Sequence, residues 1–391
     1  MRFTTARKVG RKFISLISDS RALQARSGGN VCSSGLPDRL RRTQICRAGS
    51  PEPARFRLAR QIETNAIEQR YKEYHIVKAI VTKLLPDKRR EKVVVNDWPE
   101  PAPPVGNEVL CETVYTGLTN GTERNQIIGG NYSAPDERLP AGGGYQNVGR
   151  VIKTGVDVTQ FQRGELLYAS VEHVERFTIA EDGLLLKLPA DVNPAHAALF
   201  GIAGVAMHCC RRIDARIGEK VLIIGQGCIG MFAAQIANAM GARVTVCDID
   251  ASRLAQARQL GVAEQVFNTS GDGWNAQIED DAYDAVMDFA GAADMVTPMI
   301  RACKWRGRVL LVAGRFDVNY TFNVGQHKEI SILHCSHFTC DDLENVCRLL
   351  RQGTFSIAPL IRHQVQVDEA PQIYRWLRDE PMRLLGTVFE W

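Results

Sequence analysis

The sequence predicts an α/β protein that joins a β-rich domain to a doubly wound parallel sheet. Short apolar runs broken by Gly and Pro fill residues 78–194, which is typical of an irregular β-rich domain. From residue 195 onward apolar strands alternate with helical patterns, and this alternation predicts a parallel sheet covered by helices. At 391 residues the chain is long for a single core, so we expect two domains.

The first segment, residues 1–74, is expected to be a basic extension. It holds 16 Lys and Arg against 6 Asp and Glu, which leaves the rest of the chain with a net charge of −6. Its first eighteen residues contain no acidic residue, as in a mitochondrial presequence. The stretch Val77–Leu85 (VKAIVTKLL) resembles the opening strand of a domain, so we favour a mis-annotated start near Val77. A disordered tail and a targeting peptide are the alternatives.

The β-rich pattern rests on five short runs with strand character. They read KVVVNDWP, VLCETVYTG, VGRVIKTG, ELLYASV and LLLKLP, and each ends near Gly, Pro or a polar turn. Towards the C-terminus the pattern predicts a helix near Cys340–Gln352 and another near Ala370–Arg378. A last strand is expected at Gly386–Glu390.

The strongest motif is GQGCIG at residues 225–230, between an apolar strand and an Ala-rich helix. Gly225 permits a tight turn, Gly227 lets backbone approach a pyrophosphate, and Gly230 lets the helix pack on the strand. Free N–H groups at the helix start favour an anion there, and the intervening Cys228 and Ile229 contribute two of them. The motif therefore predicts a dinucleotide site.

Asp248 ends the next strand (RVTVCD), where a carboxylate can bind the hydroxyl groups of a ribose. A 2′-phosphate would meet like charge at that place, so we expect NAD(H) rather than NADP(H). Arg253 either covers the adenosine or lies on the helix surface. Gly291 and Gly314 end later strands of the sheet and are expected to offer backbone to the nicotinamide half of the cofactor.

Composition excludes several other classes of protein. No apolar run reaches the length of a membrane helix, so we expect no membrane partner. The chain after residue 74 is acidic and lacks the clustered Lys and Arg that bind a phosphate backbone, so we expect no nucleic acid partner. The eleven cysteines include no CxxC pair, which favours buried thiols in a reducing compartment. We therefore expect a cytoplasmic protein acting on a small-molecule substrate.

The order of elements and three motifs together resemble the medium-chain dehydrogenase/reductase superfamily, which includes the zinc alcohol dehydrogenases. GLTNGTER (117–124) is similar to the family segment GICGSDLH, GYQNVGRV (144–151) to GHExxGxV, and VAMHCCRR (205–212) to VALHACRR. The resemblance implies a GroES-like catalytic domain of residues 75–195 and 336–391 and a Rossmann NAD-binding domain of residues 196–335. By analogy it also implies a homodimer. Within the superfamily, the signatures look most like the branch that contains bacteriochlorophyllide a dehydrogenase.

Carried over residue by residue, the resemblance places other residue types where the family holds its catalytic zinc. The cysteine ligand falls at Thr119, the histidine at Tyr145, the neighbouring glutamate at Gln146, and the third ligand of sorbitol-type enzymes at Gly201. The four-cysteine lobe expected after Val151 is missing from the sequence. Zinc prefers thiolate and neutral imidazole, so we expect no metal site.

Without zinc, a side chain must handle the hydroxyl proton as hydride moves to or from nicotinamide. Tyr145 is the first candidate, with Glu123 and Thr122 as relay partners and Gln146 orienting the substrate; the alternative is that Tyr145 fills the space of the metal. Two residues are expected near the cofactor: Arg124, at the place of a family histidine, and His337, on the return from the last Rossmann strand. His173 is expected in a surface loop.

These interpretations favour a zinc-independent, NAD-dependent oxidoreductase that interconverts an alcohol and a carbonyl in a specialised, for example biosynthetic, substrate. A reductase of quinones or activated C=C bonds is one alternative, although such enzymes usually take NADPH, which Asp248 disfavours. A nucleotide-binding protein without catalytic activity is another.

Overall fold

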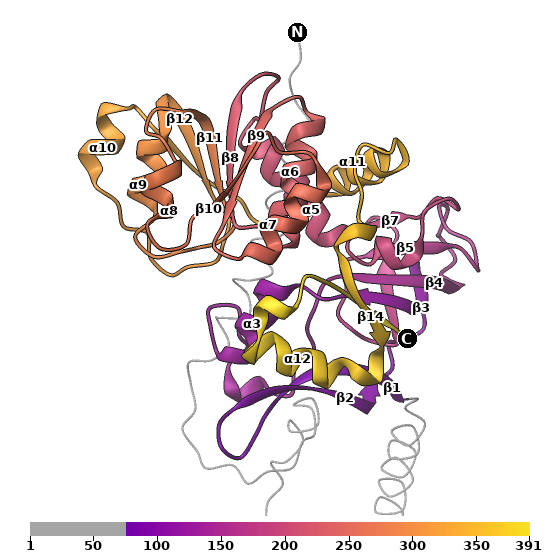
Figure 1. Cartoon of the computed structure of the whole chain (residues 1–391). Helices are drawn as coiled ribbons and strands as arrows, with labels where there is room; N and C mark the ends of the chain where they lie inside the picture. The colour runs from indigo at the N-terminus through magenta and orange to yellow at the C-terminus, as the bar shows by residue number, and fades with distance from the viewer. Residues whose placement is uncertain (1–75) are drawn as a thin grey trace, which may run out of the picture. The chain divides into compact units, whose positions relative to one another are not determined.

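The computed structural model describes residues 76–391, so the predicted extension of residues 1–74 lies outside the described residues. The described residues form a two-stranded sheet, a seven-stranded sheet and a six-stranded parallel sheet, each flanked by helices (Figure 1). This is the α/β fold with two domains that the sequence predicted, while the exact domain boundaries stay a prediction.

The N-terminal half of the described chain is β-rich. Strand β1 (Ile76–Leu84) pairs antiparallel with β2 (Arg90–Pro99), and isolated bridges join β1 to residues Ala141 and Val174. The seven-stranded sheet has the order β14-β15-β3-β4-β5-β7, with β6 paired to β3. Its strands are β3 (Glu108–Gly117), β4 (Asn147–Thr154), β5 (Leu166–Ala169), β6 (Arg176–Ala180), β7 (Leu185–Lys187), β14 (Ile361–Gln366) and β15 (Gly386–Glu390).

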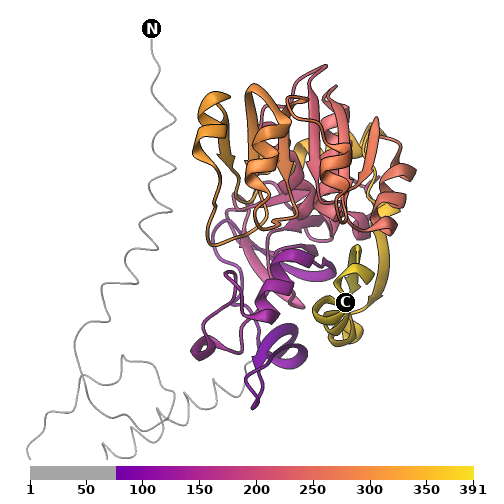
Figure 2. The same cartoon turned by 60° about the vertical axis from the view of Figure 1, so that its left-hand side comes forward.

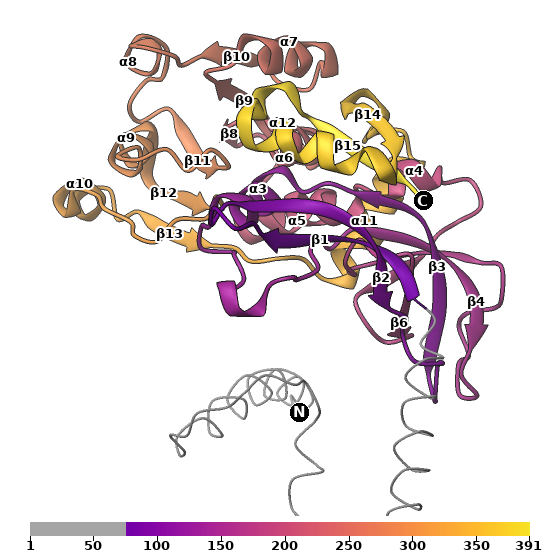
Figure 3. The same ribbon diagram turned by 90° about the horizontal axis from the view of Figure 1, so that it is seen from below.

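The C-terminal segment returns to this β-rich part. In Figure 2 the yellow segment lies with the indigo and magenta strands, and β15 is hydrogen-bonded between β14 and β3. Helix α12 (Ala370–Asp379) packs against β2 and α3 (Asn120–Ile128), although more than 240 residues separate it from α3 in the sequence (Figure 3). The return therefore brings the C-terminal helix next to the GLTNGTER segment.

The parallel sheet has the order β10-β9-β8-β11-β12-β13. Its strands are β8 (Lys220–Ile224), β9 (Arg243–Asp248), β10 (Gln265–Asn268), β11 (Tyr283–Asp288), β12 (Cys303–Leu311) and β13 (Ser331–His334). Helices α6 (Cys228–Ala239) and α7 (Ala251–Leu260) cover one face, and α8 (Gly273–Gln277) and α9 (Val296–Ala302) cover the other (Figure 1). The strand order reverses between β8 and β11, and ligands of open α/β sheets bind at the carboxyl ends beside that point.

Two further helices pack together beside the sheet. Helix α5 (Phe200–Arg212) is almost entirely buried, and it contacts α6 and α11 (Cys340–Arg351). Short helices α4 (Pro194–Ala197) and α10 (Phe322–His327) complete the connections. The first residues of α5 contact the segment that carries Tyr145 and Gln146.

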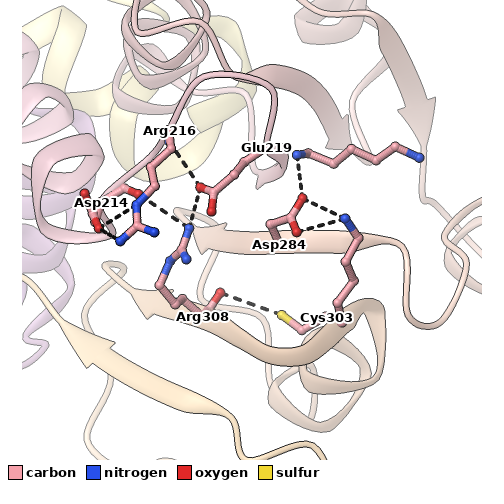
Figure 4. A network of polar contacts seen from close by, with 8 residues as sticks. Asp214, Arg216, Glu219, Asp284, Cys303 and Arg308 are labelled. Carbon is pink, nitrogen blue, oxygen red and sulfur yellow. Dashed lines mark hydrogen bonds and ion pairs between the residues drawn. The ribbon is translucent and has the colours of Figure 1, made fainter.

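A network of ion pairs fixes the amino ends of the parallel strands. Arg308 at β12 pairs with Glu219 before β8 (2.6 Å), and Lys304 pairs with Asp284 of β11 (2.8 Å), which also accepts a bond from the Lys220 amide. Figure 4 shows this network, with the exposed Asp214 and Arg216 pair beside it. It lies opposite the carboxyl ends, so it stabilises the sheet without entering a ligand site.

The predicted helices and strands are found within one or two residues of their expected bounds where a pattern was strong. The helices at Cys340–Arg351 and Ala370–Asp379 and the strand Gly386–Glu390 are examples. Strands β6, β10 and β14 were missed, since each is short and carries polar residues on its exposed side. Among residues 76–391, no helix is both long and apolar enough to cross a membrane.

Candidate active site

The glycine-rich loop has the geometry that the motif predicted. Gly225 adopts φ +89°, and a Cβ on Gly230 would lie 1.9 Å from the Gly225 carbonyl oxygen, so helix α6 packs directly on the turn. Gly227 caps α6 at its start, and a Cβ there would meet no atom within 4 Å. The space over the helix start is therefore open, and free N–H groups line it as a pyrophosphate requires.

Asp248 ties this loop to the next helix. Its buried carboxylate accepts a hydrogen bond from the Gln226 amide (2.6 Å) and another from the Asp250 amide (2.8 Å). Arg253 approaches the same carboxylate at 4.0 Å. Each carboxylate oxygen has two lone pairs, so Asp248 keeps acceptor capacity for ribose hydroxyls. The residues present thus fit a dinucleotide.

The loops after β11 and β12 are shaped by Asp288, a residue that the sequence analysis missed. Its buried carboxylate accepts bonds from the Ala290 and Gly291 amides (both 3.0 Å) and pairs with Arg315. Gly291 has φ +70°, so the turn needs glycine there. An Asp at the end of a parallel strand was the available signal, because Asp248 ends β9 in the same way.

Arg362 was also missed, and no local pattern marks it. Burial raises the pKa of the Cys228 thiol to about 12, and the charges of Arg253 and Arg362 act against this rise. The positive charges of two guanidinium groups thus act on the first residue of α6, whose start would face a pyrophosphate. Arg362 comes from β14, 134 residues after Cys228, so the chain's C-terminal return supplies it.

The four positions that the resemblance assigned to zinc chemistry lie in mutual contact. A Cβ on Gly201 would meet the Tyr168 hydroxyl at 2.4 Å, Cγ of Gln146 at 2.9 Å and the Tyr145 ring at 3.1 Å. The Thr119 side chain faces the Tyr145 hydroxyl and accepts a bond from Gln146 (3.1 Å). The donors here are hydroxyl, phenol and amide groups, which do not fit zinc. Among residues 76–391, no cluster of three His, Cys, Asp or Glu could hold a metal ion.

Gln146 uses its whole amide inside the protein. Its nitrogen donates to the Gly117 carbonyl and to Thr119 (both 3.1 Å), and its oxygen accepts from the Ile202 amide at the start of α5 (3.0 Å). The side chain is fully buried. Gln146 therefore joins β3, the Thr119 turn and α5 and fixes the backbone next to Tyr145. Its predicted role in orienting the substrate stays a prediction.

Tyr145 is surrounded by aromatic rings. Its ring lies 5.3 Å from that of His337 and 6.2 Å from that of Phe338, centroid to centroid, and the Tyr168 hydroxyl donates to its carbonyl (2.9 Å). Burial raises the pKa of Tyr145, and the hydrogen bond with Thr119 offsets part of that rise. The phenol therefore stays protonated at neutral pH. Tyr132, whose hydroxyl approaches Gly314, extends the site towards the parallel sheet.

Glu123 forms a second, fully buried cluster behind Thr119. Its carboxylate accepts bonds from the Thr119 amide (2.8 Å), from His173 (3.1 Å) and from the Tyr374 hydroxyl. Burial alone raises the pKa of Glu123, but His173, Lys92 and the Thr119 amide outweigh it and lower the pKa to about 2. These bonds include neither Tyr145 nor Thr122, so the predicted relay through Glu123 has no direct link in this structure.

The prediction that His173 lies in a surface loop is wrong, because it is 1% exposed and bonded to Glu123. Arg124 and Thr122 lie on α3, and the Arg124 guanidinium donates to the Leu377 carbonyl of α12 (3.2 Å). This bond directs Arg124 towards the C-terminal helix. Its predicted contact with the cofactor stays a prediction.

The run Gly142–Gly144 leads into the segment GYQNVGRV and packs against three side chains. A Cβ on Gly142 would lie 1.9 Å from the Glu172 carboxylate. At Gly143 it would lie 2.2 Å from the Lys92 ammonium, and at Gly144 it would lie 2.3 Å from the His173 ring. Three successive glycines thus let charged side chains pack against the backbone that leads into Tyr145.

Comparisons with known proteins agree with this architecture. A family model described as "Zinc-binding dehydrogenase" matches residues 228–352. The chain is 26% identical over 215 residues to D-xylulose reductase of Saccharomyces cerevisiae, covering 52% of this chain and 60% of that protein. It is 28% identical over 264 residues to L-threonine 3-dehydrogenase of Streptomyces avermitilis, covering 59% and 76%. The match to the first of these curated relatives spans about 60% of its length.

Solved structures share the fold at low sequence identity. A short chain alcohol dehydrogenase from Escherichia coli CFT073, complexed with cofactor NADH, has a TM-score of 0.68 at 15% identity and covers 81% of this chain and 100% of that chain. A zinc-binding dehydrogenase from Sinorhizobium meliloti 1021, bound to NADP, has a TM-score of 0.67 at 19% identity and covers 81% and 99%. The fold is thus compatible with either cofactor.

Proposed function

We propose that this chain, which belongs to the zinc-type alcohol dehydrogenase-like superfamily of medium-chain dehydrogenases/reductases, is an NAD(H)-dependent oxidoreductase that interconverts an alcohol and a carbonyl without zinc. One observation carries the proposal: the positions of the family's zinc ligands and their neighbour are Thr119, Tyr145, Gln146 and Gly201, and they pack together with hydroxyl, phenol and amide groups in place of thiolate and imidazole.

Tyr145 is the group that we assign to the proton. A bound nicotinamide supplies the carbon that gives or takes the hydride. The raised pKa of Tyr145 keeps its phenol protonated, so the phenol donates a hydrogen bond to the carbonyl oxygen of the substrate and then the proton. Thr119 faces the Tyr145 hydroxyl and orients it, while Gln146 fixes the loop. The neutral phenol is the form that donates to a carbonyl oxygen, whereas oxidation of an alcohol needs its phenolate as the base.

The side-chain set that surrounds Tyr145 is apolar on one side. His337 stacks on Phe338 at 4.5 Å, and both rings lie against Tyr145. Burial lowers the pKa of His337, so this ring stays neutral near pH 7 and adds no positive charge beside Tyr145.

Replacing Tyr145 by Phe tests the catalytic assignment. We expect kcat with NADH on a reducible aldehyde or ketone to fall by about 10²-fold or more, with little change in KM, since the lost group acts on the proton. Tyr320→Phe, at an exposed tyrosine, is the matched control and is expected to keep most of kcat. Full activity in Tyr145→Phe would contradict the assignment.

Cofactor choice is tested by fluorescence titration of the purified protein with NADH and, separately, NADPH. We expect NADH to bind more tightly, and Asp248→Ala to weaken NADH by about tenfold because a charged hydrogen bond to ribose is lost. Asp250→Ala, which removes the cap of α7, is the control and should keep the preference for NADH.

The other outcomes of this titration favour other functions. Tighter binding of NADPH by the natural chain would favour the reductase of quinones or activated C=C bonds. Binding of NADH without turnover of any alcohol, aldehyde or enone would favour a nucleotide-binding protein without catalysis.

A further inference from the structure

Two thiols from distant parts of the chain meet beside the candidate site. The Sγ atoms of Cys209, on α5, and Cys335, directly after β13, lie 3.4 Å apart although 126 residues separate them. All nine cysteines of the described region are free thiols. We propose that Cys209 and Cys335 are an oxidation site, a dithiol that hydroperoxides convert to a disulfide.

The surroundings give the two sulfurs different roles. Cys335 is partly exposed, whereas Cys209 is buried, so an oxidant reaches Cys335 first. The hydrogen bond from the Cys209 thiol lowers the pKa of Cys335, and the charge of Arg212 acts in the same direction, against burial and Asp342. The bond to Cys335, together with burial, raises the pKa of Cys209. Cys335 is therefore the nucleophile and Cys209 the resolving thiol.

The reaction balances with one hydroperoxide. The Cys335 thiolate attacks the O–O bond, forming a sulfenic acid and releasing water from hydrogen peroxide. The Cys209 sulfur then attacks the Cys335 sulfur, the S–S bond forms, and the S–O bond breaks. The Cys209 proton leaves with the hydroxyl as a second water. Two thiols lose two electrons, and the peroxide gains them.

The disulfide would fasten the segment of Cys335–Phe338 to α5. This segment follows the carboxyl end of β13, where ligands of parallel sheets bind, and it carries the two rings that lie on Tyr145. Helix α5 in turn binds Gln146 through the Ile202 amide. Oxidation would therefore covalently join the segment Cys335–Phe338 to α5, both of which contact the Tyr145 segment. This inference does not depend on the proposed activity.

Peptide mapping of the full chain tests the proposal. The Cys210→Ser variant is treated with hydrogen peroxide, blocked with an alkylating agent and digested without reductant. Serine at 210 removes the neighbouring thiol, which bonds to the Ala233 carbonyl (3.5 Å), so that a cross-link can be assigned to Cys209. We expect a Cys209–Cys335 peptide that has lost two hydrogen atoms and that dithiothreitol reverses. Alkylation of both thiols should fall by at least about tenfold, since the disulfide removes the thiolate.

Matched variants separate this pair from general oxidation. Cys340, five residues after Cys335 and also partly exposed, donates to the Gly183 carbonyl (3.5 Å), so Cys340→Ser should leave the cross-link intact. Cys335→Ser, at an accessible position, should abolish it, and circular dichroism checks that the variant folds. A Cys335–Cys340 cross-link, or Cys335 sulfinic acid with Cys209 still alkylated, would overturn the proposal.

Discussion

A single buried carboxylate, that of Glu123, joins side chains from four parts of the chain. His173 lies 50 residues away and Tyr374 lies 251 residues away, and both bond to the same oxygen. Lys92 comes from β2, and its ammonium is buried 5.6 Å from the centre of the Tyr374 ring, without a hydrogen-bond partner among the described residues. Burial lowers the pKa of Lys92, while Glu123 and Glu172 oppose that shift. The negative charge of Glu123 therefore compensates the positive charge of the buried Lys92 ammonium.

Replacing Glu123 by Gln is expected to destabilise the protein by about 3 kcal/mol at pH 7, since Lys92 would lose its buried counter-charge. The pKa of Glu123 falls from the ordinary 4.5 to about 2 on folding, so its contribution is present above pH 4.5. That contribution is lost as the pH falls towards 2. Urea unfolding at a series of pH values measures it.

The matched control is Glu172→Gln, which changes an exposed carboxylate on the other side of Lys92. Its effect should stay within about 0.5 kcal/mol. A Glu123→Gln penalty that is the same at pH 3 and pH 7 would show that the pKa of Glu123 does not fall on folding.

At the scale of elements, the segment Gly142–Gly144 positions Tyr145 relative to the β-rich sheet. Its backbone can approach the Glu172, Lys92 and His173 side chains closely because glycine has no side chain. The His173 amide also donates to the Gly143 carbonyl (2.9 Å), and Asn147, at the start of β4, donates to the Glu172 carbonyl (3.0 Å). The loop therefore enters β4 with its position fixed on both sides.

Gly143→Ala tests this packing. The added Cβ would lie 2.2 Å from the Lys92 nitrogen and 2.8 Å from the Gln126 side-chain oxygen, and the buried ammonium cannot move into water. We expect a loss of about 2 kcal/mol in the free energy of unfolding, as for an overpacked core.

Gly121→Ala is the control, because a Cβ at this exposed position of α3 would meet no atom within 4 Å. It should be neutral or stabilise by up to about 1 kcal/mol, since alanine favours a helix. Equal losses from both changes, measured by urea unfolding, would contradict the packing argument.

At the scale of the whole described chain, the last strand closes the β-rich part. Strand β15 lies between β14 and β3, and Val388 and Phe389 are fully buried. The Trp391 ring nitrogen donates to Thr116 of β3 (2.9 Å). The polypeptide leaves this sheet after β7, forms the parallel sheet and returns, so its final residues pair with a strand from the beginning of the described chain.

Deleting residues 386–391 should therefore unfold the β-rich part, because β14 loses the partner that attaches it to the sheet. We expect near-ultraviolet circular dichroism to lose the tertiary signal of this part. Trp391→Phe, which removes one hydrogen bond, should cost only about 1 kcal/mol. A deletion variant that melts with the same midpoint as the full chain would contradict the closing role of β15.

The sequence by itself determined the features that depend on near neighbours. Residues 225–230 and Asp248 predicted the dinucleotide loop, because strand, turn and helix start follow one another within about thirty residues. The alternation of strands and helices likewise predicted the parallel sheet. Residue-by-residue resemblance also placed Thr119, Tyr145 and Gln146 at one site, and the structure brings them into contact.

Only the tertiary structure decided which charged side chains are buried and which side chains are their partners. Lys92 looks like a surface residue in sequence, since a charged side chain is ordinarily solvated, and Glu123 was expected as a relay partner of Tyr145 rather than as a buried counter-charge. Their burial depends on partners that the fold brings from far along the chain, as does the meeting of Cys209 and Cys335. Local patterns report backbone preference and amphipathic faces, whereas the free energy of a buried charge depends on the groups that surround it in space.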